Sequence, residues 1–310
     1  MDSNQFEEIA LHAHQLMSEQ DFDSIAVAAI DFKKNQFLCF EFQNGVRHLE
    51  PFLYFDLASL TKALTNSAIR LKQPELFDPK MDLLLNHQAG LPLGGRLSKK
   101  AWKEFIFAYE VKESETLYSD YSSLRTMLEL EKKSGKSLKE LCSFYFDEEL
   151  VYWNELPEYA LTPMSGMREK KPIHKEVHDD NCLVLNQFVS HAGLFATIAG
   201  LAKSLLNLNK ETAMITQMQE KFKTFNQSQR FINGFDHPQD LENTLAAKGC
   251  SAHTFGHLGF TGTSFWIDSD RSVGHIILTN ATQHYWYSRA GLTKIRKELG
   301  SELWSFLTKE

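Results

Sequence analysis

A serine and a lysine three residues apart are the residues of this sequence whose types and spacing most directly suggest chemistry. Ser59 and Lys62 lie in the stretch Phe55-Asp-Leu-Ala-Ser59-Leu-Thr-Lys62. Residues three apart share one face of a helix. A buried lysine with a lowered pKa can take the proton that makes a serine hydroxyl a poor nucleophile. The pair therefore predicts an activated serine.

By composition alone, a chain of this length contains about one Ser-x-x-Lys by chance, and a solvated helix face is the simplest interpretation of such a pair. Here the pair follows the apolar stretch Phe52-Leu-Tyr-Phe and precedes Ala63, Leu64, Ala68 and Ile69. The helix that it begins is therefore expected to be largely buried.

The composition favours a globular protein and argues against several partners. The 310 residues are 43% hydrophobic, the net charge is −7 and the pI is about 6.0. This negative charge and the absence of a Lys/Arg-rich run argue against nucleic acid and anionic membranes as partners. The first residues contain no basic region followed by an apolar core, which predicts cytoplasmic residence. Residues 181–202, although free of Asp, Glu, Lys and Arg, are too polar for a membrane span and are interpreted as buried core.

The pattern of apolar residues predicts where helices and strands lie. Helical spacing occurs near both ends, at Phe6–Met17 and Leu292–Phe306. Hairpins are predicted for residues 25–32 with 36–43, and for residues 263–268 with 273–279. Most of the segment from about 59 to 248 is typical of helices and loops.

This arrangement predicts an α/β (α+β) fold. A mostly antiparallel sheet would be built from the N- and C-terminal segments, flanked by the terminal helices and joined to an inserted helical subdomain. The expected division is a sheet subdomain of residues 1–72 and 249–310 and a mainly helical subdomain of residues 73–248. The two would form one compact catalytic unit with the site between them.

Four segments, in order, resemble motifs of the serine β-lactamase and penicillin-binding-protein superfamily. Phe55 to Lys62 is similar to its nucleophile motif, and Leu84-Leu-Asn-His-Gln-Ala-Gly-Leu-Pro92 resembles a stretch found after it. Glu115-Thr-Leu-Tyr118-Ser-Asp120 resembles the second motif, Tyr-x-Asn, before a helix. Gly256-His257-Leu-Gly259-Phe260 resembles the third, which opens a strand with Lys or His, one residue, then Gly. The chain is most similar to the branch of class C β-lactamases, D-alanyl-D-alanine carboxypeptidases and related esterases, which implies that fold.

The resemblance implies roles for individual residues. Ser59 would be acylated, Lys62 would help to deprotonate it, and Tyr118 would act as general base and then general acid. The backbone N–H groups of Ser59 and of Phe260, on the strand that follows, would form the oxyanion hole. The chemistry is consistent with these roles, because a tyrosine exchanges protons at neutral pH only if cations such as Lys62 lower its pKa.

Two other segments match the motifs literally. Tyr152-Trp-Asn154 fits Tyr-x-Asn, and His191-Ala-Gly193 fits His-x-Gly. Tyr152 has no Ser-Gly-Lys after it. The residues that follow His191 have the pattern of a loop that enters a helix. The context therefore favours Tyr118 and His257.

Two positions depart from the motifs and bear on the substrate, which His257, Gly259 and Asp120 are predicted to bind. Asp120 replaces an asparagine, and an ionised carboxylate only accepts hydrogen bonds. It could pair with Lys62 and keep that amine protonated, or it could favour a substrate amine. His257 stands where many penicillin-binding enzymes have lysine, and an imidazole is mostly neutral at pH 7. The weaker hold on a carboxylate favours esters or small amides.

The polar segment His174-Lys-Glu-Val-His178-Asp179-Asp180-Asn181, with His191 after it, allows two interpretations. His178, Asp179 and His191 are of types that bind zinc. The sequence contains no His-Glu-x-x-His or paired-cysteine pattern, however, and similar stretches in this superfamily are loops around the cleft. We therefore expect a hydrogen-bonded loop that lines the site, with no metal and no cofactor.

The sequence thus predicts a serine hydrolase that forms an acyl-enzyme on Ser59 and hydrolyses a small ester, a D-amino-acid amide or peptide, or a cell-wall fragment. The alternative is a catalytically silent relative that binds a peptide or cell-wall fragment, which the replacement at Asp120 keeps open. A metal-dependent hydrolase is a third possibility. The expected partner is a small-molecule or peptide substrate, and neither the substrate nor the oligomeric state follows from the sequence.

Overall fold

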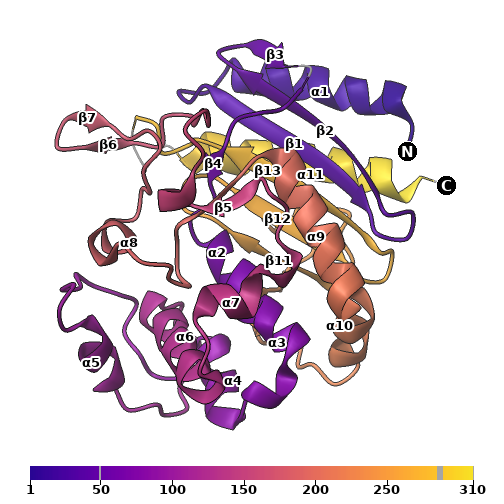
Figure 1. Cartoon of the computed structure of the whole chain (residues 1–310). Coiled ribbons are helices and arrows are strands. Elements are labelled where there is room, and N and C mark those ends of the chain that lie inside the picture. Colours follow the sequence, from indigo (N-terminus) through magenta and orange to yellow (C-terminus); the bar gives the residue numbers. More distant parts are fainter. Residues whose placement is uncertain (49, 285–288, 310) are drawn as a thin grey trace.

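An eight-stranded antiparallel sheet forms the centre of the molecule, for which we analysed a computed structural model (Figure 1). The structure describes residues 1–48, 50–284 and 289–309. The strands follow the order β3-β2-β1-β13-β12-β11-β10-β9. Their bounds are β1 Ser24–Asp31, β2 Gln36–Gln43, β3 Val46–His48, β9 Phe231–Ile232, β10 Phe235–Asp236, β11 Thr254–Leu258, β12 Ser264–Asp268 and β13 Val273–Thr279. Both predicted hairpins, β1–β2 and β12–β13, are confirmed.

The two ends of the chain meet in this sheet. Strand β1 pairs with β13 in antiparallel register, Ile25 opposite Thr279 and Asp31 opposite Val273. This long-range pairing joins the N- and C-terminal segments into one layer, as the sequence predicts.

Helices α1 (Ser3–Met17) and α11 (Arg289–Thr308) cover one face of the sheet (Figure 1). Alternate residues of β1 point to opposite faces. Ile25, Val27 and Ala29 join the core beneath the terminal helices, whereas Ala26, Ala28 and Ile30 join the larger core on the other face. Since both faces are covered, every residue of β1 from Ser24 to Ile30 is buried. The predicted terminal helices are confirmed.

The other face of the sheet is covered by helix α9 (Ile198–Thr212), which contacts β1, β2 and β13. A group of helices and helical turns lies below the sheet in Figure 1. Its members are α2 Leu60–Lys62, a π-helical turn η1 Ala63–Ser67, α3 Ala68–Lys72, a 3-10 turn η2 Pro74–Leu76, α4 Pro79–Leu85, α5 Trp102–Phe107, α6 Asp120–Ser134 and α7 Leu138–Cys142. The segment that contains Ser59 and Lys62 thus continues from α2 through η1 into α3, and the apolar side chains of these elements are buried in the larger core.

The segment between residues 143 and 230 connects these layers. It contains the 3-10 turns η3 Ser143–Tyr145 and η4 Trp153–Glu155, the helices α8 Asp180–Leu185 and α10 Met214–Phe222, and the small hairpin β6 Met167–Arg168 with β7 Lys171–Pro172. Strands β4 Phe55–Asp56, β8 Leu194–Ala196 and β5 Leu150–Tyr152 form a separate three-stranded sheet. Strand β4 ends just before Ser59, so this small sheet fixes the start of the nucleophile segment.

The structure differs from the expected division of the chain at the end of the inserted segment. Strands β9 and β10 extend the main sheet beyond β11, and α9 packs on that sheet, although all three elements belong to the range 73–248. The chain therefore returns to the sheet layer before residue 248. Two-residue strands have no alternating pattern to reveal them, which explains the discrepancy.

Among the helices that the structure describes, none is both long enough and apolar enough to cross a membrane.

Acid should destabilise the sheet layer through His275, which is buried in β13 against Trp304 (ring centroids 4.6 Å apart). Burial lowers the pKa of His275 to about 4. Between pH 4 and about 6.5, the unfolded chain binds a proton at this residue that the folded chain does not, so stability rises with pH across this window. The full effect is about 3 kcal/mol.

We expect His275→Phe, which stays apolar and aromatic, to flatten the pH dependence of Tm between pH 4 and 6.5 relative to the wild type. Parallel thermal melts at several pH values measure this difference. Plots of Tm against pH with equal slopes for the two proteins would show that His275 does not contribute to the pH dependence of stability.

Candidate active site

The residues before Ser59 hold the backbone in an uncommon conformation. Ala58 has φ +45°, a left-handed value that costs energy for a residue other than glycine. The Asp56 carboxylate stabilises this turn, because its Oδ1 accepts a hydrogen bond from the Ala58 N–H at 2.8 Å. The turn places Ser59 at the first turn of α2, where it lines a pocket.

Lys62 lies one turn along the same helix and is 4% exposed. Its Nζ is 2.9 Å from Ser59 Oγ, 3.0 Å from the carbonyl oxygen of His191 and 2.7 Å from Asp120 Oδ1. An ammonium group has three hydrogens, which these acceptors and the neighbouring Tyr118 share. In this arrangement Lys62 donates to Ser59.

The pKa of Lys62 is the reverse of what the sequence suggested. Burial alone would lower it, but the charge of Asp120 and the neighbouring Tyr118 outweigh burial and raise the pKa above its ordinary value. The hypothesis of a lysine with a lowered pKa is therefore wrong for this state of the site, and the alternative that Asp120 keeps Lys62 protonated matches the geometry.

Tyr118 lies beside this pair, with Lys62 Nζ 4.9 Å from the centroid of its ring. The ring packs against His87 at 4.7 Å, His257 at 6.0 Å and Phe231 at 6.1 Å between centroids. Burial raises the pKa of Tyr118, although Lys62 acts in the opposite direction, as do hydrogen bonds from Lys62 and Ser59. The expectation that cations lower this pKa overall is wrong, because burial is the larger effect.

The loop before α6 is held in place by His87. The imidazole Nδ1 accepts a hydrogen bond from the Ser119 N–H at 3.1 Å, and the His87 carbonyl accepts one from the Leu117 N–H at 2.9 Å. Burial lowers the pKa of His87 well below its ordinary value, so the ring is neutral and can accept. The Ser119 hydroxyl caps α6 by accepting from the Ser122 N–H, which sets Asp120 as the first residue of that helix.

The third motif lies at the end of β11. His257 is in the strand, Gly259 follows it and Phe260 lies in the turn before β12, so the expectations that the motif opens a strand and that Phe260 is within one are wrong. A Cβ on Gly259 would lie 1.9 Å from Thr263 Oγ1 and 2.7 Å from the Leu57 carbonyl oxygen. Only glycine allows this turn to approach the nucleophile segment so closely.

His257 is buried, and burial lowers its pKa to about 4. The imidazole is therefore neutral at pH 7, in line with the interpretation made from the sequence. Phe260 is 42% exposed and lines the pocket together with Ser59 and Gly259. The oxyanion hole formed by the N–H groups of Ser59 and Phe260 stays a prediction.

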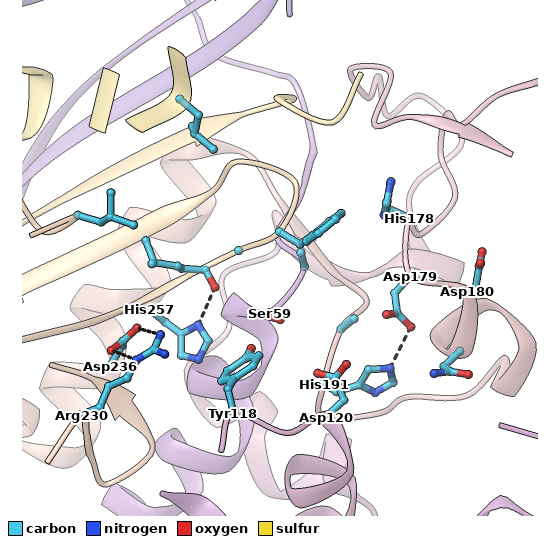
Figure 2. Close-up of a pocket in the computed structure, with 18 of the residues that line it drawn as sticks. Ser59, Tyr118, Asp120, His178, Asp179, Asp180, His191, Arg230, Asp236 and His257 are labelled. Carbon is cyan, nitrogen blue, oxygen red and sulfur yellow. Dashed lines mark hydrogen bonds and ion pairs between the residues drawn. The ribbon is translucent and has the colours of Figure 1, made fainter. Parts of the chain in front are cut away.

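The polar loop predicted at the cleft also lines the pocket, through His178 and Asp179. His191, which comes 12 residues after Asp179 in the sequence, lines it as well (Figure 2). Asp179 Oδ1 is 3.0 Å from His191 Nε2 and accepts from the Cys182 N–H at 2.7 Å, which caps α8. Burial would raise the pKa of Asp179, but His191 and the α8 cap lower it below its usual range. His178 instead donates its backbone N–H to Asp56 Oδ2 at 2.7 Å.

Asp179 and His191 thus bond to each other, and Figure 2 shows the His178 ring apart from that pair. In the described part of the chain, no group of three or more His, Cys, Asp or Glu residues is arranged to hold a metal ion.

Tyr152, the alternative match to the Tyr-x-Asn motif, lies in the hydrophobic core and not at the pocket. Tyr152 is 1% exposed, and its hydroxyl donates to the Gln187 carbonyl at 2.6 Å and is 2.9 Å from Cys182 Sγ. It packs inside the core and is not among the residues that line the pocket with Ser59.

Sequence reasoning missed three residues at the site. Asp56 links the nucleophile turn to the cleft loop, and Arg230 pairs with Asp236 through Nε–Oδ1 at 3.0 Å and Nη2–Oδ2 at 2.9 Å beside His257 (Figure 2). Asp56 precedes the serine within the motif, which is a signal that could have been used. No local signal marks Arg230 and Asp236, because they reach the site only through the pairing of β10 with β11.

One pocket of about 740 Å³ is lined by Ser59, Tyr118, Asp120, His178, Asp179, His191, Arg230, Asp236 and His257, and Lys62 is buried behind Ser59. Its walls come from the nucleophile turn, the Tyr118–Asp120 segment, the 178–181 loop, the end of β11 and helix α11. A serine hydroxyl that is hydrogen-bonded to a buried cation, next to a tyrosine and open to a pocket of this size, is an arrangement suited to acyl transfer.

The Beta-lactamase family model matches residues 78–298, which is more than half of the chain, and the chain therefore belongs to that family. No curated protein matches it.

Solved structures share the fold at low sequence identity. A β-lactamase from Mycobacterium bovis is similar with a TM-score of 0.64 and 16% identity, covering 96% of this chain and 100% of that one. A mutant simvastatin synthase from Aspergillus terreus gives 0.63 and 13%, covering 100% and 99%. An octameric penicillin-binding protein homologue from Pyrococcus abyssi gives 0.66 and 15%, covering 97% and 78%. The predicted superfamily and fold class are confirmed.

Proposed function

We propose that the protein is a serine hydrolase that cleaves an ester or amide through an acyl-enzyme on Ser59. The proposal rests on one observation: Ser59 Oγ lies 2.9 Å from Lys62 Nζ beside Tyr118, at the wall of a pocket large enough for a small-molecule or peptide substrate. Membership of the Beta-lactamase family supports this class of chemistry.

In this mechanism Tyr118, and not Lys62, takes the proton of Ser59. Lys62 donates to Ser59 Oγ and has a raised pKa, so it holds a positive charge next to the reacting oxygen. Tyr118 must first release its own proton to solvent water, and the charge of Lys62 would stabilise the tyrosinate so formed. The tyrosinate would then take the proton of Ser59, and the resulting phenol would give that proton to the leaving group. The N–H groups of Ser59 and Phe260 would bind the oxyanion.

The substrate is expected to be a small ester, a D-amino-acid amide or peptide, or a cell-wall fragment. The neutral His257 gives little hold on a carboxylate, which favours uncharged esters and amides. The test is hydrolysis of p-nitrophenyl acetate by the wild type and by Ser59→Ala. Turnover that Ser59→Ala abolishes would support the proposal, whereas equal turnover by both proteins would contradict it.

A second candidate is a silent relative that binds a peptide or cell-wall fragment, and one observation favours it. Asp120 forms a 2.7 Å ion pair with Lys62 in place of the neutral asparagine of the motif. The buried amine of Lys62 is thereby held by the Asp120 carboxylate and the His191 carbonyl as well as by Ser59.

Asp120→Asn separates the two candidates. Without the carboxylate, burial is expected to lower the pKa of Lys62, so the alkaline limb of the pH–rate profile should move to lower pH. A silent wild type that becomes active as Asp120→Asn would establish the second candidate. An active wild type whose profile Asp120→Asn leaves unchanged would show that the ion pair does not tune the site.

A further inference from the structure

The part of the pocket beside β11 contains a buried hydrogen-bond acceptor without a protein partner. His257 is 2% exposed, and its Nδ1 lies 2.8 Å from the Leu258 carbonyl oxygen. Since a carbonyl oxygen only accepts, Nδ1 must carry the hydrogen, and Nε2 of the neutral ring is then an acceptor. Nε2 has no partner in the described residues.

A donor without a partner lies next to it. Arg230 uses Nε and Nη2 to bind Asp236, and Nη1 has no hydrogen-bond partner within the described part of the chain. The Arg230 side chain is 45% exposed and lines the pocket near His257 (Figure 2). Asp236 is 8% exposed and is fixed by the pairing of β10 with β11, opposite Gly256.

We propose that Arg230, Asp236 and His257 form a subsite, here called the β11 subsite, that binds an uncharged group with both an acceptor and a donor on the leaving group of the substrate. A carboxamide or a hydroxyl fits, because its oxygen can accept from Arg230 Nη1 while its hydrogen is donated to His257 Nε2. This inference rests on the proposed function and names the substrate class of the same site.

The position of Tyr118 assigns the β11 subsite to the leaving group. In the proposed mechanism Tyr118 protonates the leaving group, which must therefore lie against Tyr118. The ring of Tyr118 packs on that of His257, with centroids 6.0 Å apart, and Arg230 stacks on Phe231, which packs on Tyr118 in turn. A group attached to the leaving atom thus reaches the β11 subsite first.

A carboxylate is disfavoured at the β11 subsite for two reasons. The two-point ion pair with Asp236 already offsets the charge of Arg230, and a second carboxylate would be repelled by the first. It would also place an acceptor against the lone pair of His257 Nε2, whereas a carboxamide makes both hydrogen bonds.

Three phenylacetyl thioesters test this, in which the thiol is thioglycolamide, thioglycolate or propanethiol. They place a carboxamide, a carboxylate or an ethyl group at the same distance from the reacting carbon. We measure kcat/KM for the wild type and Kd for Ser59→Ala, which binds without turnover. The carboxamide ester should exceed each of the others by about tenfold in affinity, the size of one well-placed polar contact.

Asp236→Asn should reverse the preference. It leaves Arg230 with an uncompensated charge, so the carboxylate ester should gain at least about tenfold relative to the carboxamide ester. Arg230→Gln should reduce the carboxamide ester to the level of the propyl ester. Asp82→Asn is the matched control, because it breaks a similar ion pair with Arg70 away from the pocket. It should leave all ratios unchanged.

The inference is overturned if Ser59→Ala binds the carboxylate ester as tightly as the carboxamide ester, or if Asp236→Asn and Arg230→Gln both leave the ratio at its wild-type value. Differences in thiol reactivity cancel when each kcat/KM ratio is compared between a variant and the wild type, and they do not enter Kd for Ser59→Ala. Failure of the proposed function is separate, since it would appear as absent turnover by the wild type while the binding preference of Ser59→Ala persists.

Discussion

Replacing Tyr118 with phenylalanine is expected to lower kcat for an ester substrate by about 10²-fold or more, in line with typical general-base contributions. Lys62 donates to Ser59 Oγ and is held as a cation by Asp120, whereas Tyr118 is hydrogen-bonded to Ser59 and can move the proton. The ring packs between His87, Phe231 and His257, and phenylalanine preserves these contacts. Single-turnover and steady-state hydrolysis of p-nitrophenyl acetate measure the loss.

Tyr152→Phe is the matched control for this prediction. It removes the same hydroxyl from the competing tyrosine, which bonds to the Gln187 carbonyl inside the core. The control should lose stability without a comparable loss of kcat, because a buried hydrogen bond contributes about 1 kcal/mol. If Tyr118→Phe turned over like the wild type, the proton would have to leave Ser59 by another route.

The second large effect is expected at Lys62. Lys62→Met should lower kcat by about 10³-fold, comparable with removal of a group that stabilises charge in the transition state. The substitution removes the cation that bonds to Ser59 and stabilises a tyrosinate at Tyr118. It also leaves Asp120, which is 32% exposed, without its partner. Steady-state kinetics, with Tm measured in parallel, separates loss of activity from loss of folding.

Two further variants make the Lys62 prediction specific. Lys72→Met, which breaks a surface pair with Glu211, should keep wild-type kcat. Lys62→Met combined with Asp120→Asn removes the unpaired carboxylate and should recover stability but not activity. Activity of Lys62→Met within about tenfold of the wild type would show that the lysine is structural.

The fold could be predicted from the sequence where elements are long and regularly patterned. The hairpins β1–β2 and β12–β13 and both terminal helices follow from local periodicity, and the buried strand β1 packs on both faces as an apolar run suggests. Strands β9 and β10 could not be predicted. Each has two residues, and only their pairing with each other and with β11 makes them part of the sheet.

The sequence is sufficient to predict which motif residues come together at the site, but not the direction in which their pKa values are shifted. Ser59, Lys62, Tyr118, Asp120 and His257 come together around the pocket as their motifs indicated. The pKa directions of Lys62 and Tyr118 differ from expectation because each depends on opposing effects of burial and of neighbouring charge. The balance between those effects is set by distances, such as the 2.7 Å between Lys62 and Asp120, that a sequence does not contain.

Asp56 is a residue of the Ser59 motif whose role at the site could not be predicted from the sequence. It precedes Ser59 by three residues, and the functional pattern is complete without it. In the structure its carboxylate accepts hydrogen bonds from the left-handed turn at Ala58 and from the backbone of His178. It thereby ties the turn before Ser59 to the loop that lines the pocket, through a hydrogen bond between residues 122 positions apart in the sequence.

The most direct test of the central claim is the intact mass of the protein after exposure to a fluorophosphonate probe and, separately, to penicillin, with Ser59→Ala as control. We predict a single fluorophosphonate adduct on the wild type and none on Ser59→Ala. Labelling by penicillin as well would favour a wall-peptide substrate over a general ester. An unmodified wild-type mass with both reagents, or an adduct that persists in Ser59→Ala, would contradict acyl transfer at Ser59.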